Sequence, residues 1–197
     1  LGGFNVGLLD MQTRTGDTQA PASNFAVVRV SREFPNRSRA GAIFVNREAT
    51  GDLAGDRDYN RSYAVDARMG FGKNGLVNGF VARTQTPGLS GEQYAFQLGA
   101  SHNTEAWRLG VGYAEGDNFN PEVGFLSRDN GFRKAELSVN RNVRLRPGSF
   151  WKFHELRPHV NYDSYWNFDG LLETGRLHAD QHWQFRAGHE FHTGMNV

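Results

Sequence analysis

Several polar side chains have types and spacings that suit metal binding. Asp52, Asp56 and Asp58 follow one another in a polar segment, and carboxylate oxygens are ligands that calcium takes. Their spacing does not match the EF-hand loop, so residue type alone makes them calcium candidates. The sequence leaves the metal content of the protein open, and we predict no cofactor.

Four histidines lie near the end of the chain, at positions 178, 182, 189 and 192. In a strand, residues at i and i+4 share a face but lie about 13 Å apart, because each residue rises about 3.3 Å. His178 and His182 are then too far apart to bind one zinc ion, unless the chain turns near Asp180. A zinc site is therefore not the favoured interpretation of these histidines.

Hydrolysis needs a nucleophile or carboxylate beside a positioned base. The candidates for a nucleophile and its base are Ser138 or Ser164 with His154 or His159. The candidates for a glycosidase pair are Glu115 and Glu122. Nothing in the sequence fixes the distances within either set. We therefore predict no catalytic residue, and an enzyme is not the favoured class.

A long irregular segment, EGDNFNPEVGFLSRDNG, begins at Glu115. Its Asn and Pro residues are turn formers first, because Asn side chains bond to nearby backbone and Pro121 keeps the preceding residue out of the helical region. The polar residues that are loop candidates for binding are Asn118, Asn120, Glu122 and Arg128.

Alternation of apolar and polar residues predicts the elements that position these side chains. The clearest case is Arg61–Phe71, in which Tyr63, Val65 and Met69 share one face and Asp66 lies on the other. Similar alternation predicts strands over residues 3–12, 24–32, 39–48, 76–85, 93–101, 107–114, 132–139, 156–162, 171–179 and 183–191.

The connections between these strands alternate between long and short. In a meander, every second connection lies at the same end, so the long loops share one end of the sheet and the tight turns share the other. Outer-membrane barrels have this asymmetry, with strands of about ten residues. The sequence predicts an all-β, antiparallel up-and-down transmembrane β-barrel of about 10 or more strands. An odd number of strands would leave it unclosed, as part of a larger barrel.

The charged residues on the polar face favour this barrel over a soluble one. Isolated charges of both signs suit interior ion pairs, and aromatic residues near strand ends suit girdles at the two membrane interfaces. The residues that we predict to face the lumen are Asp66, Arg68, Arg83, Arg108, Lys134 and Glu136. A soluble barrel or sandwich that binds a small apolar ligand inside stays open as an alternative.

The composition excludes several further classes of site and of protein. The 197 residues include no cysteine, which excludes disulfides, thiolate metal sites and cysteine nucleophiles. The net charge of +1 gives no electrostatic case for nucleic acid. No apolar run is long enough for a spanning helix. We expect residues 1–197 to form a single β-barrel domain, excised from a longer protein because the sequence begins abruptly without Met.

The segment GDNFNPEVGFLSR (Gly116–Arg128), with FAVVRVSRE, RSRAGAIFVNRE and DYNRSYAVDARMGFG upstream, resembles the C-terminal barrel domain of a bacterial outer-membrane family. Its members carry an N-terminal carbohydrate-binding module of the family-nine type, which this sequence lacks. The chain also departs from the family by ending at Val197 without an aromatic residue.

This resemblance implies a location in the bacterial outer membrane, with the lipid bilayer and lipopolysaccharide as partners and glycans bound through the absent module. The expected function is that of a pore or membrane anchor linked to glycan binding or uptake. A soluble barrel that binds an apolar ligand and an outer-membrane hydrolase are the alternatives, and the oligomeric state is not predicted.

Overall fold

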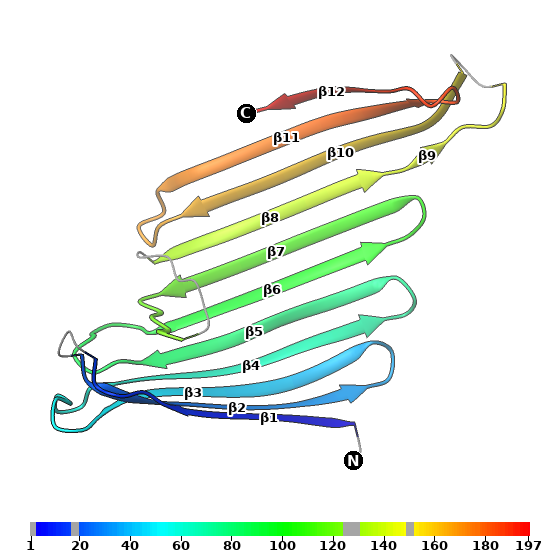
Figure 1. The fold of residues 1–197 in the computed structure, drawn as a ribbon. Coiled ribbons are helices and arrows are strands. Elements are labelled where there is room, and N and C mark those ends of the chain that lie inside the picture. Colours follow the sequence, from blue (N-terminus) through cyan, green and yellow to red (C-terminus); the bar gives the residue numbers. More distant parts are fainter. Residues whose placement is uncertain (1–2, 17–19, 124–130, 149–151) are drawn as a thin grey trace. The chain divides into compact units, whose positions relative to one another are not determined.

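The computed structural model describes residues 3–16, 20–123, 131–148 and 152–197. Within these ranges the chain forms twelve strands and no α-helix, and it contains no helix long and apolar enough to cross a membrane. The strands (Figure 1) are β1 (Phe4–Gln12), β2 (Ala22–Phe34), β3 (Ser38–Thr50), β4 (Tyr59–Phe71), β5 (Gly75–Gln85), β6 (Tyr94–Asn103), β7 (Trp107–Asp117), β8 (Phe132–Arg141), β9 (Val143–Arg144), β10 (Phe153–Trp166), β11 (Leu172–Phe185) and β12 (Glu190–Asn196).

The strands pair in sequence order, from β1 to β8 and on through β10 and β11 to β12, while the short β9 pairs with β10. The short connections at 35–37, 72–74 and 104–106 alternate with the longer ones at 13–21, 51–58, 86–93 and 118–131. The all-β, antiparallel up-and-down fold is thus confirmed. Closure of the sheet into a barrel stays a prediction.

The last two strands differ from the prediction. Strand β11 runs without a break from Leu172 to Phe185, and the turn lies at 186–189, where Phe185 N–H donates to the carbonyl oxygen of His189 at 2.8 Å. The predicted strand at 171–179 is thus part of β11, but the prediction that it ends at 179 and that a second strand covers 183–191 is wrong. The polar residues at 178–182 resemble a loop in sequence, but they continue the two-residue alternation of one strand.

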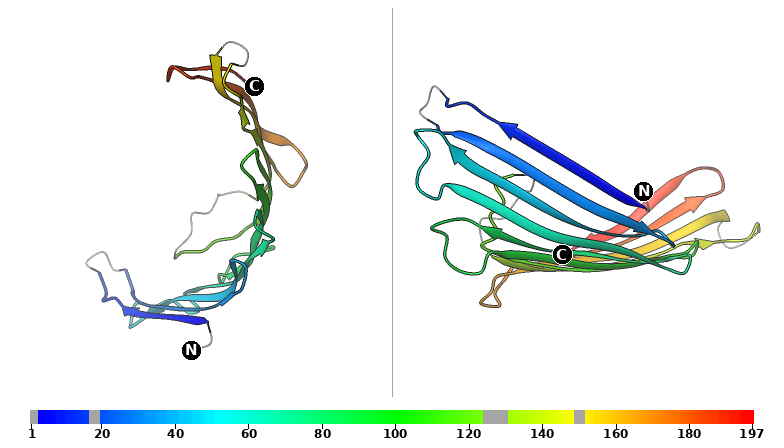
Figure 2. Two further views of the ribbon diagram at one scale, coloured as in Figure 1. Left: turned by 90° about the vertical axis from the view of Figure 1, so that its right-hand side faces the viewer. Right: turned by 90° about the horizontal axis from the view of Figure 1, so that it is seen from below.

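The chain divides into two compact units. The first comprises residues 1–69, 78–97 and 115–132, and the second comprises 70–77, 98–114 and 133–197. In the first unit, β1 pairs with β2 along its whole length, as can be followed in Figure 2. Strands β2 and β3 pair from the position where Ala22 faces Thr50 to the turn at 35–37. Each unit has one apolar and one polar face.

In the first unit, the register places apolar residues in rows across β1 to β4. Val6, Val30, Ala42 and Val65 occupy successive paired positions in one such row. The neighbouring row contains Leu8, Val28, Phe44 and Tyr63. The face that carries these rows is the apolar face of the first unit, and the face that carries Arg29 and Asp66 is its polar face.

The second unit repeats this division. One row across β8, β10, β11 and β12 contains Val139, Val160, Ala179 and Met195. The next row, on the opposite face, contains Ser138, Asn161, His178 and Asn196. The first of these rows defines the apolar face of the second unit, and the second defines its polar face.

Candidate functional site

Ion pairs lie on the polar face of each unit. In the first unit, Arg29 of β2 pairs with Asp66 of β4 across the intervening strand β3. Gly41 of β3 leaves room for this pair, because a Cβ there would lie 2.8 Å from an Arg29 guanidinium nitrogen. In the second unit, Lys134 pairs with Glu136. These pairs compensate charges that are only partly exposed to water.

Five of the six residues predicted to face a lumen lie on the polar faces. Asp66 and Arg68 do so in the first unit, and Arg108, Lys134 and Glu136 do so in the second. The lumen itself stays a prediction.

Arg83 lies on the other face of its strand, so its predicted orientation is corrected. Its neighbour Thr84 is buried on the polar face, where its hydroxyl contacts the loop that follows β7. Alternation then places Arg83 with Val81 on the apolar face. Arg83 is two residues from the end of β5, and a long side chain at that position can extend its guanidinium beyond the apolar surface.

The first part of the loop between β7 and β8 is bound to the polar face of the first unit. Asn60 of β4, only 2% exposed, is the centre of this attachment. Its amide nitrogen donates to the carbonyl oxygen of Asn120 at 2.8 Å and to Thr86 Oγ1 at 2.9 Å, and its amide oxygen accepts from Glu122 N–H at 3.3 Å. Thr84 Oγ1 accepts from Asn120 N–H at 3.2 Å.

A second contact holds the loop through charge. Arg47 of β3 donates from Nε to Glu122 Oε2 at 2.7 Å, and its Nη1 donates to the carboxylate and to the carbonyl oxygen of Asp58. The Arg47 side chain is largely buried, at 15% exposure. An arginine that bonds two carboxylates in a partly buried position stabilises the fold more than an exposed ion pair does, because less water screens the charges. The residues Arg47, Asp58, Asn60, Asn120 and Glu122 are called the loop anchor below.

The structure brings three of the four loop candidates to this region. Asn120 and Glu122 belong to the loop anchor, Asn120 through its backbone. Asn118 adopts a left-handed conformation with φ of 44°, which Asn tolerates better than most residues. Arg128 lies outside the described residues. In the left view of Figure 2, the green segment that follows β7 extends away from the strands of the sheet.

The three calcium candidates do not converge. Asp52 and Asp56 are exposed on the connection between β3 and β4, while Asp58 bonds to Arg47. A carboxylate that already neutralises an arginine is a poor partner for a cation.

The hydrolytic candidates are not assembled either. Glu115 accepts a hydrogen bond from Tyr94 on the apolar face, whereas Glu122 binds Arg47 on the polar face. Two carboxylates on opposite faces cannot flank one glycosidic bond.

Neither serine candidate donates a hydrogen bond to a histidine in the described part of the chain. Ser138 donates to Asn161 Oδ1 at 2.7 Å. Ser164 has no exposed surface and its hydroxyl has no hydrogen-bond partner.

Histidines and carboxylates in the second unit can hold a metal ion. Two groups have ligand atoms within 4.8 Å of one another: His159, His178 and Asp180, and Asp180, His182 and His192. Sequence reasoning missed both, because His159 comes from another strand and the predicted strands at 171–179 and 183–191 left Asp180 and His182 between them. The signal was the alternation His178, Asp180, His182, which places all three on one face only if β11 is continuous.

Comparison with known proteins gives no match: no family model, curated protein or solved structure matches this chain. The resemblance to the C-terminal barrels of an outer-membrane family therefore stays a prediction.

Proposed function

We propose that this chain forms a transmembrane β-barrel of a bacterial outer membrane and acts as a passive pore. The apolar faces contact lipid, the polar faces line a water-filled lumen, and the loop held by the loop anchor narrows that lumen. The proposed partners are the lipid bilayer and the lipopolysaccharide of such a membrane.

The observation that carries this proposal is the exposure of the apolar faces. Leu8 is 74% exposed and Val65 and Val111 are each 58% exposed, although each lies within a strand. Soluble proteins rarely expose continuous apolar surface beyond a few hundred Å². Transfer of each such side chain out of water is favourable by about 1.5–3 kcal/mol, and a lipid bilayer supplies that environment.

The small number of buried apolar residues supports the same reading. In the ranges that the structure describes, the hydrophobic residues that are buried are Val45, Ala82 and Phe153. A soluble barrel would bury its apolar face as a core. In this chain the apolar side chains are instead the exposed ones, which is the arrangement that a lipid-facing surface requires.

Strand length and aromatic placement also fit a membrane. A strand of ten residues is about 33 Å long, so a tilt of about 40° lets it cross an apolar band of about 25 Å. Exposed aromatic side chains lie at strand ends beside the short connections, at Phe34, Phe71, Trp107 and Phe191. Tyr59 and Tyr94 lie at strand ends beside the longer connections. Such aromatic belts are typical of the two membrane interfaces.

The experiment that tests this function is single-channel recording. We expect the full chain, purified in detergent and added to a planar phospholipid bilayer, to produce stepwise ionic currents. Current steps need both insertion through the apolar faces and a lumen lined by the polar faces. A heat-denatured sample of the same protein is the control.

Two results would reject the pore. A chain that inserts into lipid vesicles without carrying current would be an anchor. A chain that stays monodisperse in buffer without detergent would be a soluble barrel, and its binding of a small apolar ligand would then be the function to test. The glycan link implied by the resemblance stays a prediction that no contact in the described residues supports.

A further inference from the structure

A cluster of histidine and carboxylate side chains on the polar face of the second unit is not used by the proposed pore. Three adjacent strands supply it, and the register aligns its members: His159 of β10 pairs with Asp180 of β11, and His182 of β11 pairs with His192 of β12. Residues from three strands therefore converge on Asp180.

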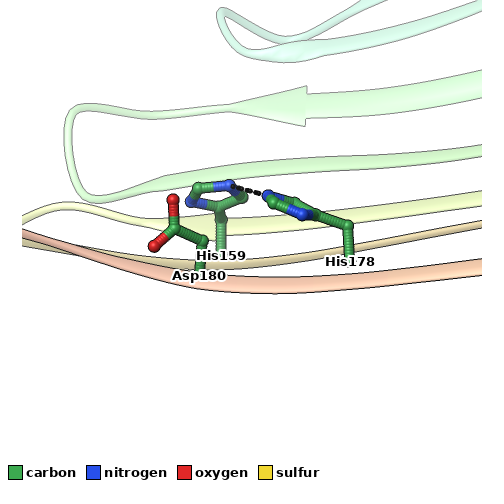
Figure 3. Close-up of side chains that lie close together, drawn as sticks. All are labelled: His159, His178 and Asp180. Atoms are coloured by element: carbon green, nitrogen blue, oxygen red, sulfur yellow. Dashed lines mark hydrogen bonds between the residues drawn. The ribbon is translucent and has the colours of Figure 1, made fainter. Parts of the chain in front are cut away.

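Two ring nitrogens in this cluster face each other directly. His159 Nε2 lies 3.1 Å from His178 Nε2, and the ring planes are inclined by 42° (Figure 3). The carboxylate of Asp180 completes the group, because its ligand atoms and those of the two histidines all lie within 4.8 Å of one another.

The outer nitrogens of both rings face oxygen acceptors. His178 Nδ1 lies 2.7 Å from Asn196 Oδ1, and His159 Nδ1 lies 3.5 Å from the carbonyl oxygen of Arg157. If each Nδ1 carries the proton that it donates, the Nε2 atoms of two neutral rings both present lone pairs. Two lone pairs at 3.1 Å repel each other, so a cation between them stabilises the arrangement.

Asp180 is held ready to bind such a cation. Its side chain is only 11% exposed, and its Oδ1 is buried with no hydrogen-bond partner among the described residues. A buried carboxylate oxygen without a partner is costly. Gly194 of β12 leaves space for this carboxylate, because a Cβ there would lie 3.1 Å from Oδ1.

A further histidine orients the carboxylate. His182 Nε2 lies 3.3 Å from Asp180 Oδ2, while His182 Nδ1 lies 2.8 Å from Glu190 Oε1. This chain of carboxylate, imidazole and carboxylate fixes which oxygen of Asp180 remains available. Metal sites use outer hydrogen bonds of this kind to orient their ligands.

We propose that His159, His178 and Asp180 bind one divalent transition-metal ion. In tetrahedral zinc sites the metal–nitrogen distance is about 2.0–2.1 Å, which puts two nitrogen ligands about 3.3 Å apart. The observed 3.1 Å between the two Nε2 atoms is close to that value. Imidazole ligands select zinc, copper, nickel or iron rather than calcium or magnesium.

Three protein ligands leave at least one coordination position for water or for a bound molecule. The three ligands are half-buried, which lets a dissolved ion reach them from the polar face. This proposal does not depend on the pore, because it rests on contacts within β10, β11 and β12 alone.

Zinc and cobalt titrations of the full chain, purified in detergent and stripped with a chelator, test the site. We expect calorimetry to give one zinc ion per chain, and Co²⁺ to give the visible absorption of a low-symmetry site with nitrogen ligands. The substitutions H159Q and H178Q should each weaken zinc binding at least 100-fold. H189Q, in the turn at 186–189, is the matched control and should leave the affinity unchanged within twofold.

His182 is a positioning residue, so H182Q should weaken zinc binding by about 10–100-fold while the stoichiometry and the Co²⁺ spectrum are kept. Equal zinc affinity in H159Q, H178Q and H189Q would overturn the proposal. If H159Q and H178Q do not fold, urea unfolding of the wild-type chain tests the site by itself. Its urea midpoint should rise with added zinc, and an unchanged midpoint at millimolar zinc would overturn the site.

Discussion

Replacement of Val65 by arginine is expected to lower the free energy of unfolding in a lipid bilayer by about 2–4 kcal/mol, the cost of an arginine at the membrane midplane of a barrel. Val65 is the central residue of β4 and lies on the apolar face. The neighbouring Ala64 lies on the polar face, between Ser62 and Asp66, so A64R should change the stability by about 1 kcal/mol or less.

Urea unfolding in phospholipid vesicles, followed by tryptophan fluorescence, measures both effects. The paired variants share one strand and one introduced side chain, and they place the charge on opposite faces. If Val65 faced water instead of lipid, V65R would place a charge on a water-exposed surface and cost almost nothing. Equal stability of the two variants would therefore contradict a lipid-facing Val65.

The second large effect is expected from N60A, which removes the centre of the loop anchor. The Asn120 carbonyl and the Glu122 N–H lose their partner in a partly buried position, and each such loss costs about 1–3 kcal/mol. We expect the loop at 118–123 to separate from the polar face. In the proposed pore the same substitution raises the single-channel conductance, because the lumen widens.

Amide hydrogen exchange measures the release of the loop directly. In N60A, the amides of Asn120 and Glu122 should exchange much faster than in the wild-type chain. N5A is the control, since Asn5 is an exposed asparagine of the first unit and its removal should leave those amides protected. Unchanged protection in N60A would show that Arg47 or another contact holds the loop without Asn60.

The period of two along the strands made most of the fold predictable. Alternation such as that of Tyr63, Val65 and Met69 identifies a strand and both of its faces, because side chains in a strand can point only two ways. Alternation fails where polar residues occupy both faces in succession. That occurs around Asp180, where the sequence could not distinguish a loop from a strand with a polar face.

The long-range contacts were not predictable from the sequence. Asn60 meets the backbone of Asn120 and Glu122, which lie about sixty positions later in the chain. The histidine and carboxylate cluster also depends on contacts between separate strands, since the register of β10 and β11 brings His159 to His178. Residues at i and i+4 of one strand, such as His178 and His182, lie about 13 Å apart, whereas paired residues of adjacent strands lie only about 4.7–4.9 Å apart.

The central claim is that the apolar faces contact lipid, and a single-cysteine scan along β4 tests it most directly. The chain has no cysteine of its own, so a fluorescent probe can be attached to one introduced thiol at a time, from position 62 to position 69. We predict that quenchers on lipid chains suppress the probes at 63, 65, 67 and 69, whereas aqueous iodide suppresses those at 62, 64, 66 and 68. Quenching of the odd-numbered positions by iodide and not by lipid would contradict the claim.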